Sequence, residues 1–129
     1  YLEMHGRPRR PRDLAQHGAI LLSVLSSPAS WIFTARNGDQ VRVRLAPRVQ
    51  SDSAAAVHAM ALAGAGVAVL PDFMVEADLA GGRLEHLFPT QRLPEGSFHA
   101  VHANLHAPAK VRAFIEHLRK SIAGTRAGA

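Results

Sequence analysis

Apolar runs mark two strands that the sequence predicts to be buried. Residues 19–25 and 67–70 are apolar with little alternation, which is typical of strands covered on both faces. Each run is strand-sized, and neither approaches the roughly 18 apolar residues that a membrane-spanning helix needs. We therefore expect both segments to lie inside a folded domain.

A third pattern alternates apolar residues with arginines. It covers residues 41–45 and predicts a strand with one face in water. The Asn37-Gly38 pair lies between this strand and a strand expected over residues 31–35, and both positions of such a pair tolerate positive φ. The sequence therefore predicts an antiparallel hairpin.

Helical patterns separate the strands. An alanine-rich helix is expected over residues 54–63, ended by Gly64, and a last helix opens at Pro108. The last helix carries one apolar stripe, formed by Val111, Phe114, Ile115, Leu118 and Ile122. The other expected elements are a helix end over residues 1–5, a turn capped by Asp13, strands over residues 48–50, 84–87 and 98–103, and a helix capped by Asp72 and running to about Ala80. Strands that alternate with helices predict the α/β class, here with a mixed sheet flanked by helices.

Composition narrows the class of protein. The chain has 129 residues, of which 47% are hydrophobic and 19% charged, so one folded domain is expected rather than disorder. It contains no cysteine, which excludes disulfides and thiolate zinc sites. This composition agrees with a cytoplasmic protein.

Positive charge is in excess, with a formal net charge of +5. Four arginines cluster within residues 7–12, but Pro8 and Pro11 forbid a continuous helix there. The pattern favours a solvated loop over a groove-fitting DNA-binding element. The charge excess can still attract a parent protein to DNA over long range.

Motifs for catalysis, nucleotides and metals are incomplete. Gly64-Ala65-Gly66 lacks the third glycine of a dinucleotide fingerprint and follows a helix instead of a strand. His99 and His102 are expected on opposite faces of a strand, and no nucleophile elbow exists. We therefore expect no enzyme activity, no cofactor and no metal site.

Two polar segments are candidates for small-molecule binding. One lies at the start of the alanine-rich helix, whose free N–H groups suit an anion. The other follows the first buried strand, where ligands of open α/β sheets collect. The candidate residues are Ser26, Ser27, Pro28, Ser30, Trp31, Ser51, Asp52 and Ser53. Helix capping alone by the serines and core packing of the tryptophan remain open alternatives, and the carboxylate opposes an anion if it points inward.

The order of motifs resembles the effector-binding domain of LysR-type transcriptional regulators. The matching segments are YLEMHGRP at residues 1–8, DLAQH at 13–17, WIF at 31–33, ALAGAGVAVLP at 61–71, LAGGRL at 79–84 and PAKVRAFI at 108–115. The resemblance implies a periplasmic-binding-protein-like (type 2) fold, with residues 1–94 as the second lobe. Residues 95–129 would then be the crossover strand and C-terminal helix of an incomplete first lobe.

The same resemblance implies a function. A small, anionic or aromatic effector would bind between the lobes and control oligomer geometry, as a dimer or tetramer, through a population shift. DNA would be bound only by a helix-turn-helix outside this chain, and no membrane is involved. A solute-binding protein of the same bilobal fold is the alternative. The apolar stripe of the last helix is expected to pack on another copy or against its own lobe.

Overall fold

The computed structural model describes residues 1–94 and 108–126, with side chains described as far as residue 121. The chain divides into two compact units, Tyr1–Pro94 and Glu95–Ala129. In order, the elements are α1 (Leu2–His5), the 3₁₀ helix η1 (Pro11–Gln16), β1 (Gly18–Leu22), β2 (Ser30–Thr34), β3 (Gln40–Arg44), β4 (Ala46–Ser51), α2 (Ala54–Leu62), β5 (Val67–Ala68), α3 (Asp72–Ala80) and α4 (Ala109–Arg126). The expected α/β class is confirmed.

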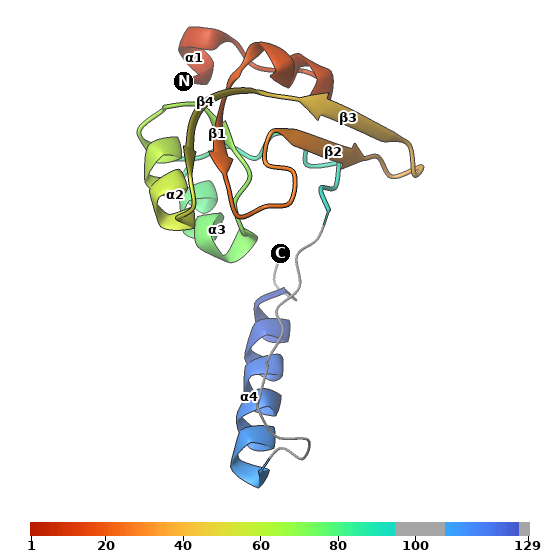
Figure 1. The fold of residues 1–129 in the computed structure, drawn as a ribbon, viewed down its shortest axis with the longest axis vertical. Helices are drawn as coiled ribbons and strands as arrows, with labels where there is room; N and C mark the ends of the chain where they lie inside the picture. The colour runs from red at the N-terminus through yellow and green to blue at the C-terminus, as the bar shows by residue number, and fades with distance from the viewer. Residues whose placement is uncertain (95–107, 127–129) are drawn as a thin grey trace. The chain divides into compact units, whose positions relative to one another are not determined.

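A three-stranded parallel sheet in the order β4-β1-β5 forms the centre of the first unit (Figure 1). The central strand β1 is buried on both faces, as its continuous apolar run predicts. Ala19 and Leu21 pack into one hydrophobic cluster and Ile20 and Leu22 into the other. Val57 of α2 completes the second cluster, so α2 covers one face of the sheet.

β1 is shorter than the sequence predicts. It ends at Leu22 rather than Leu25, because the Leu25 N–H donates back to the Leu22 carbonyl at 3.2 Å and turns the chain out of the sheet. Val24 is then 68% exposed. Residues 23–25 were expected in the strand because the run is apolar, but the backbone turns there and the strand ends before them.

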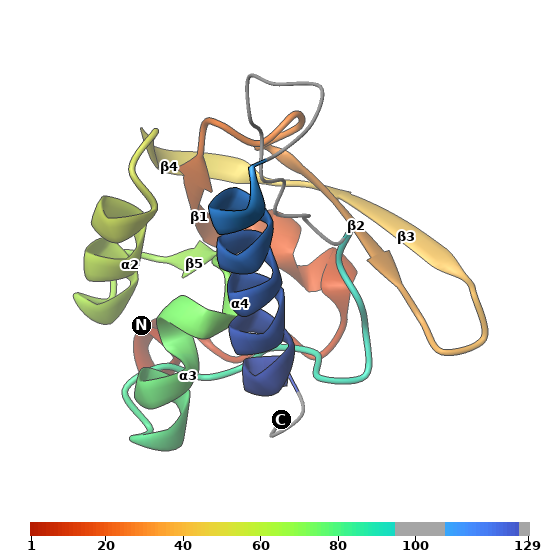
Figure 2. The same ribbon diagram turned by 90° about the horizontal axis from the view of Figure 1, so that it is seen from below.

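The predicted hairpin is confirmed as β2 and β3, which extend away from α2 and α3 (Figure 1, Figure 2). Pairing ends at Thr34 and Gln40, so the connection is longer than two residues. Gly38 takes a φ of 90°, whereas the Asn37 side chain accepts from the Asp39 N–H at 3.1 Å. Gly38 thus takes the positive φ that the sequence predicts. Asn37 instead stabilises the turn through the hydrogen bond that its side chain accepts.

The inner face of the hairpin closes the first cluster. Trp31 and Phe33 meet at 6.4 Å between ring centroids, and Val43 and Leu45 are buried beside them. Leu14 of η1 packs on the same cluster. The alternation predicted for residues 41–45 is therefore confirmed, with the apolar side inward.

Three expected elements differ in detail. Residues 84–87 form no strand, because the Leu84 N–H is taken by the Asp78 carbonyl at 3.2 Å in the turn after α3. Asp72 is the first residue of α3 rather than its N-cap, which is Pro71. Asp13 lies inside η1, where it accepts from the Arg10 N–H that precedes the helix.

The second unit contributes α4. The helix begins at Ala109, one residue after the predicted start at Pro108, whose carbonyl accepts from the Val111 N–H at 2.9 Å. Phe114 is 60% exposed, whereas Val111 and Ile115 are half-buried. The Ile122 side chain and the strand expected over residues 98–103 lie outside the described residues, and the expected partner of the stripe stays a prediction.

Candidate functional site

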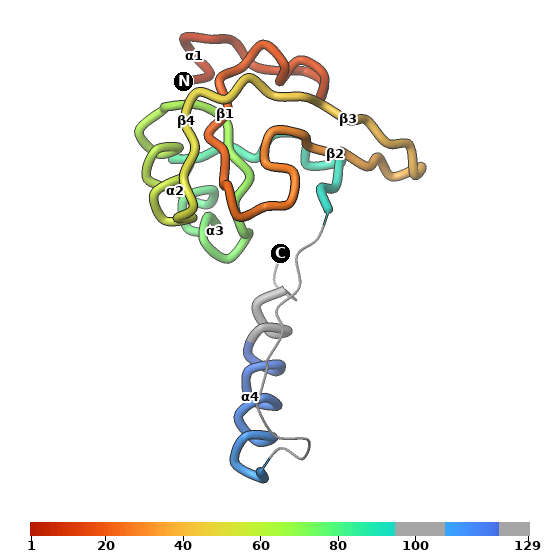
Figure 3. The backbone as a smooth tube through the Cα atoms, viewed as in Figure 1, coloured from red at the N-terminus to blue at the C-terminus, as the bar shows by residue number. Residues whose placement is uncertain are grey.

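The two polar segments predicted from the sequence leave the parallel sheet at the same edge. β1 and β4 run parallel, with Leu22 paired to Ser51. Just beyond, the Ser23 N–H donates to the Ser51 carbonyl at 2.8 Å. Figure 3 follows the backbone from this edge into the loop that leads to β2. One wall of a candidate site therefore forms where β1 and β4 end.

The serines at this edge are ordered by local hydrogen bonds. The Ser53 Oγ accepts from the Ala56 N–H at 3.3 Å and caps α2, and the Ser51 Oγ accepts from the Ser53 N–H at 3.1 Å. Because each hydroxyl accepts in these bonds, each keeps its own hydrogen to donate. Asp52 between them is exposed. The segment thus combines capping with two available donors and one carboxylate.

The loop that carries the second segment starts at one end of β1 and finishes at the other. Ser26 and Ser27 are exposed, and the Ser30 N–H donates to the Ser27 carbonyl at 3.1 Å. The Ala29 carbonyl accepts from the Leu45 N–H at 3.0 Å. Leu45 precedes Ala46, which pairs with Gly18 at the amino end of β1. The loop therefore starts beside Ser51, but its end at Ser30 is held at the opposite end of the strand.

Trp31 is 8% exposed and lies in the first hydrophobic cluster. Its indole N–H donates to the Pro28 carbonyl at 3.0 Å. The side chain thus fastens the loop to the core, and Pro28 is held by that bond. This placement separates Trp31 and Pro28 from the serines at the end of β4.

A polar network joins α2 and α3 that was not predicted from the sequence. His58 Nε2 lies 2.6 Å from Asp78 Oδ2, and Arg83 forms an ion pair with the same carboxylate. Asp78 is 3% exposed. It falls three and four residues after Val75 and Met74, on the apolar side of α3. A carboxylate at such a position is a signal that could have indicated the network.

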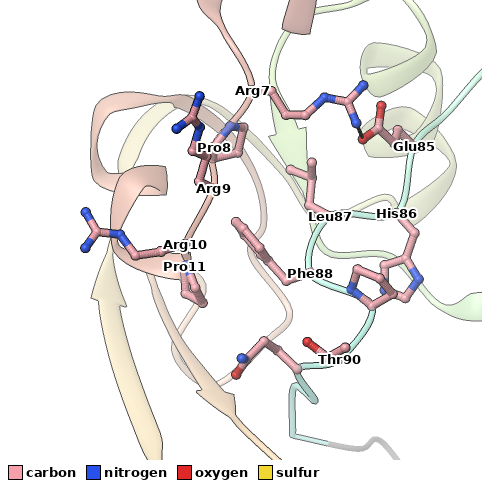
Figure 4. Close-up of a pocket in the computed structure, with 12 residues that line it drawn as sticks. Arg7, Pro8, Arg9, Arg10, Pro11, Glu85, His86, Leu87, Phe88 and Thr90 are labelled. Atoms are coloured by element: carbon pink, nitrogen blue, oxygen red, sulfur yellow. Dashed lines mark hydrogen bonds and ion pairs between the residues drawn. The ribbon is translucent and has the colours of Figure 1, made fainter.

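A hollow of about 510 Å³ lies between residues 7–11 and 85–91 (Figure 4). Arg7 is directed to Glu85, with which it forms an ion pair, and Arg10 points away from Phe88. Phe88 has a φ of 57° and packs edge-on against Phe33 at 5.7 Å. The guanidinium groups do not converge, so we assign no ligand to this hollow.

The described part of the chain contains neither a candidate metal site nor a candidate membrane-spanning helix. No group of three histidine, cysteine or carboxylate residues there is arranged to hold a metal ion. No helix in the same residues is long and apolar enough to cross a bilayer. His99 and His102, which the sequence predicts on opposite faces of a strand, lie outside the described residues.

Proteins of known structure share this fold. The regulatory domain of AphB from Vibrio vulnificus superposes with a TM-score of 0.66 at 22% identity, covering 94% of this chain and 60% of that one. Full-length AphB from Vibrio cholerae, described as a virulence activator of the LTTR family, gives a TM-score of 0.61 at 23% identity over 73% of this chain and 32% of that one. The expected periplasmic-binding-protein-like fold is confirmed.

Sequence relatives are named as transcriptional regulators. The HTH-type transcriptional regulator PtxR of Pseudomonas aeruginosa is 40% identical over 114 residues, which is 88% of this chain and 36% of PtxR. An uncharacterized HTH-type regulator of Haemophilus influenzae is 33% identical over 112 residues, 86% of this chain and 38% of that protein. The chain thus spans little more than a third of the length of either relative. The model of the LysR substrate binding domain matches residues 1–123, and the chain therefore belongs to this family.

Proposed function

We propose that the chain is the effector-sensing part of a LysR-type transcriptional regulator. The observation that supports this most directly is the register of β1 and β4, which starts both candidate segments at one sheet edge. The relatives are regulators, not solute carriers, so the regulator reading is favoured over a solute-binding protein. The names of these relatives also favour a binding function over a catalytic one.

The proposed effector is a small molecule with an anionic group. Its anion would accept from the hydroxyls of Ser51 and Ser53 near the positive end of the α2 dipole. Exposed Ser26 would extend the wall from the loop that starts beside Ser51, and exposed Ser27 would do so only through its side chain, because its carbonyl accepts from the Ser30 N–H. Pro28, Ser30 and Trp31 would support the loop. Asp52 must point away from the anion or meet a polar group of the effector.

The proposal assigns residues 1–94 to the second lobe and residues 95–129 to part of the first. A pocket normally buries most of its ligand, so this chain should bind the effector more weakly than the whole regulator does. In the whole cytoplasmic protein, effector binding would shift the population between lobe arrangements and so between oligomer geometries. Sequence-specific DNA contacts belong to a helix-turn-helix outside this chain.

The test is a thermal-shift screen of small aliphatic and aromatic carboxylates on the full-length regulator. A carboxylate that raises the Tm should lose its effect in Ser51→Ala. Ser53→Asp provides the sharper variant, because aspartate keeps the N-cap of α2 but places a negative charge where the anion would sit. We expect it to melt like the parent protein without ligand and to show no shift with ligand.

Thr90→Ala is the matched control, since it removes one hydroxyl far from this edge in sequence and on another segment. It should keep the full shift. A carboxylate shift that survives both Ser51→Ala and Ser53→Asp would overturn the assignment of the site.

A further inference from the structure

The hairpin has a second face, opposite the hydrophobic cluster. Side chains of paired residues lie on the same face of an antiparallel ladder. Arg44 pairs with Ser30 and Arg42 with Ile32. Both arginines are exposed, while Ile32 is half-buried. Two guanidinium groups therefore project from one strand at i and i+2, on the side that the core does not use.

A third row continues this face at the far end of β2. Thr34 pairs with Gln40 on one side and with Arg92 on the other. The Thr34 N–H donates to the Arg92 carbonyl at 2.8 Å, and the Arg92 N–H donates to the Thr34 carbonyl at 2.8 Å. These bonds fix Arg92 beside the hairpin. We call the surface formed by Ser30, Thr34, Gln40, Arg42, Arg44 and Arg92 the arginine face.

The arginines of the arginine face have no carboxylate partner within the part of the chain that the structure describes. No ion pair reaches Arg42, Arg44 or Arg92 among the residues that the structure describes, whereas Arg7, Arg10 and Arg83 each have a carboxylate partner. The single acidic residue in the hairpin is Asp39, at the turn, where its carboxylate accepts from the Asn37 amide at 2.7 Å. Like charges on one face repel each other, so the face is suited to a partner that supplies negative charge.

We propose that the arginine face binds the phosphate backbone of double-stranded DNA without reading its sequence. Every polar side chain on the face is a hydrogen-bond donor of the kinds that contact phosphates: arginine, serine, threonine and glutamine. An acidic protein partner fits less well, because protein interfaces usually have an apolar core. The defined residues of the arginine face are all polar, and the apolar Ile32, which pairs with Arg42, is half-buried beneath them.

This function goes beyond effector sensing and does not depend on the effector site. Contacts from the sensing domain would add a salt-dependent, non-specific term to operator binding by the whole regulator. The free energy of operator binding would then also depend on where this domain lies relative to the DNA. Binding by this chain alone is expected in the range of non-specific complexes, with a Kd of roughly 10⁻⁴ to 10⁻⁶ M at physiological salt.

The experiment measures binding of the 129-residue chain to a fluorescent DNA duplex of random sequence by anisotropy, over a series of salt concentrations. Each phosphate contact contributes about 0.9 to the slope of log K against log salt. Arg42→Gln with Arg44→Gln should therefore lower the slope by about 1.8. Arg42→Lys with Arg44→Lys should restore most of it, because lysine keeps the charge.

The matched control is Arg9→Gln with Arg12→Gln, which removes the same charge from two exposed arginines, one in the loop before η1 and one in η1. Neither forms an ion pair with any residue that the structure describes. It should lower the slope by less than half as much. Equal losses in the two double variants would overturn the proposal, because net charge alone would then explain binding. So would failure of the parent chain to bind at low salt, or binding to polyglutamate as tight as to DNA.

Discussion

His58 on α2 and Asp78 on α3 are joined by a 2.6 Å contact between Nε2 and Oδ2. The carboxylate is buried and also pairs with Arg83 in the turn that follows α3. Ser53 caps the helix that carries His58. The contact therefore ties the helix that is capped by Ser53, one of the candidate effector-binding serines, to α3.

Asp78→Asn should destabilise the first unit. The substitution keeps the size of the side chain but removes the charge that His58 and Arg83 meet. Charge-assisted bonds are worth about 1.5–3 kcal/mol each, and Arg83 is largely exposed, which screens its share. We expect the free energy of unfolding to fall by about 2 kcal/mol in urea denaturation. Glu76→Gln, exposed on the same helix, should change it by less than about 0.5 kcal/mol; equal losses would contradict the role of the network.

Local patterns in the sequence predicted most elements, and the reasons are visible in particular residues. The capping serine Ser53 and the Asn37-Gly38 turn are encoded within a few positions. The end of β1 at Leu22 depends on a backbone turn that apolar residues do not reveal. The contact between His58 and Asp78 spans twenty positions, so the spacing of apolar residues can mark Asp78 as unusual but cannot identify its partner.

The candidate site also combines features that local sequence predicts with features that depend on distant contacts. Ser51 and Ser53 could be predicted because helix starts have a recognisable composition. The placement of Trp31 could not, because it follows from the bond between Ala29 and Leu45, which requires β2 and β3 to have paired already. The arginine alternation was visible in the sequence, but the addition of Arg92 to that face was not.

Gly66→Ala should be far more disruptive than Gly18→Ala, although the two glycines face each other. A Cβ at Gly66 would lie 2.3 Å from the Gly18 carbonyl oxygen, which is backbone and cannot yield without moving β1. At Gly18 the nearest atom is the Arg48 Cδ at 3.2 Å, on a flexible side chain. We expect losses of about 3 kcal/mol and under about 1 kcal/mol respectively, in thermal or urea unfolding. A larger loss for Gly18→Ala would contradict this packing.

Asp13 should make stability depend on pH in the acid range. The Arg10 backbone N–H is the main cause that holds the pKa of this carboxyl below its ordinary value of 3.8, helped by the Arg9 N–H and the Arg10 guanidinium. A lowered pKa in the folded state means that the carboxylate stabilises the fold above pH 3.8, and that this contribution is lost as the pH falls through the lower folded value.

The measurement is an NMR titration of the Asp13 carboxyl, with a midpoint expected below 3.8. Asp13→Asn should also weaken the dependence of the urea midpoint on pH in this range. A titration midpoint at or above the ordinary value would contradict the bonding seen at the start of η1.

Trp31→Phe should loosen the loop that leads into β2. The substitution removes the indole N–H that donates to the Pro28 carbonyl at 3.0 Å and costs about 1–3 kcal/mol in lost hydrogen bonding and packing. The Ser30 N–H, which donates to the Ser27 carbonyl inside this loop, should then exchange with solvent faster than the fall in global stability explains. Phe33→Leu is the control, because it removes ring volume from the same cluster but leaves the Pro28 bond intact. If hydrogen exchange at Ser30 accelerates equally in both variants at matched stability, Trp31 acts through core packing alone and does not hold the loop.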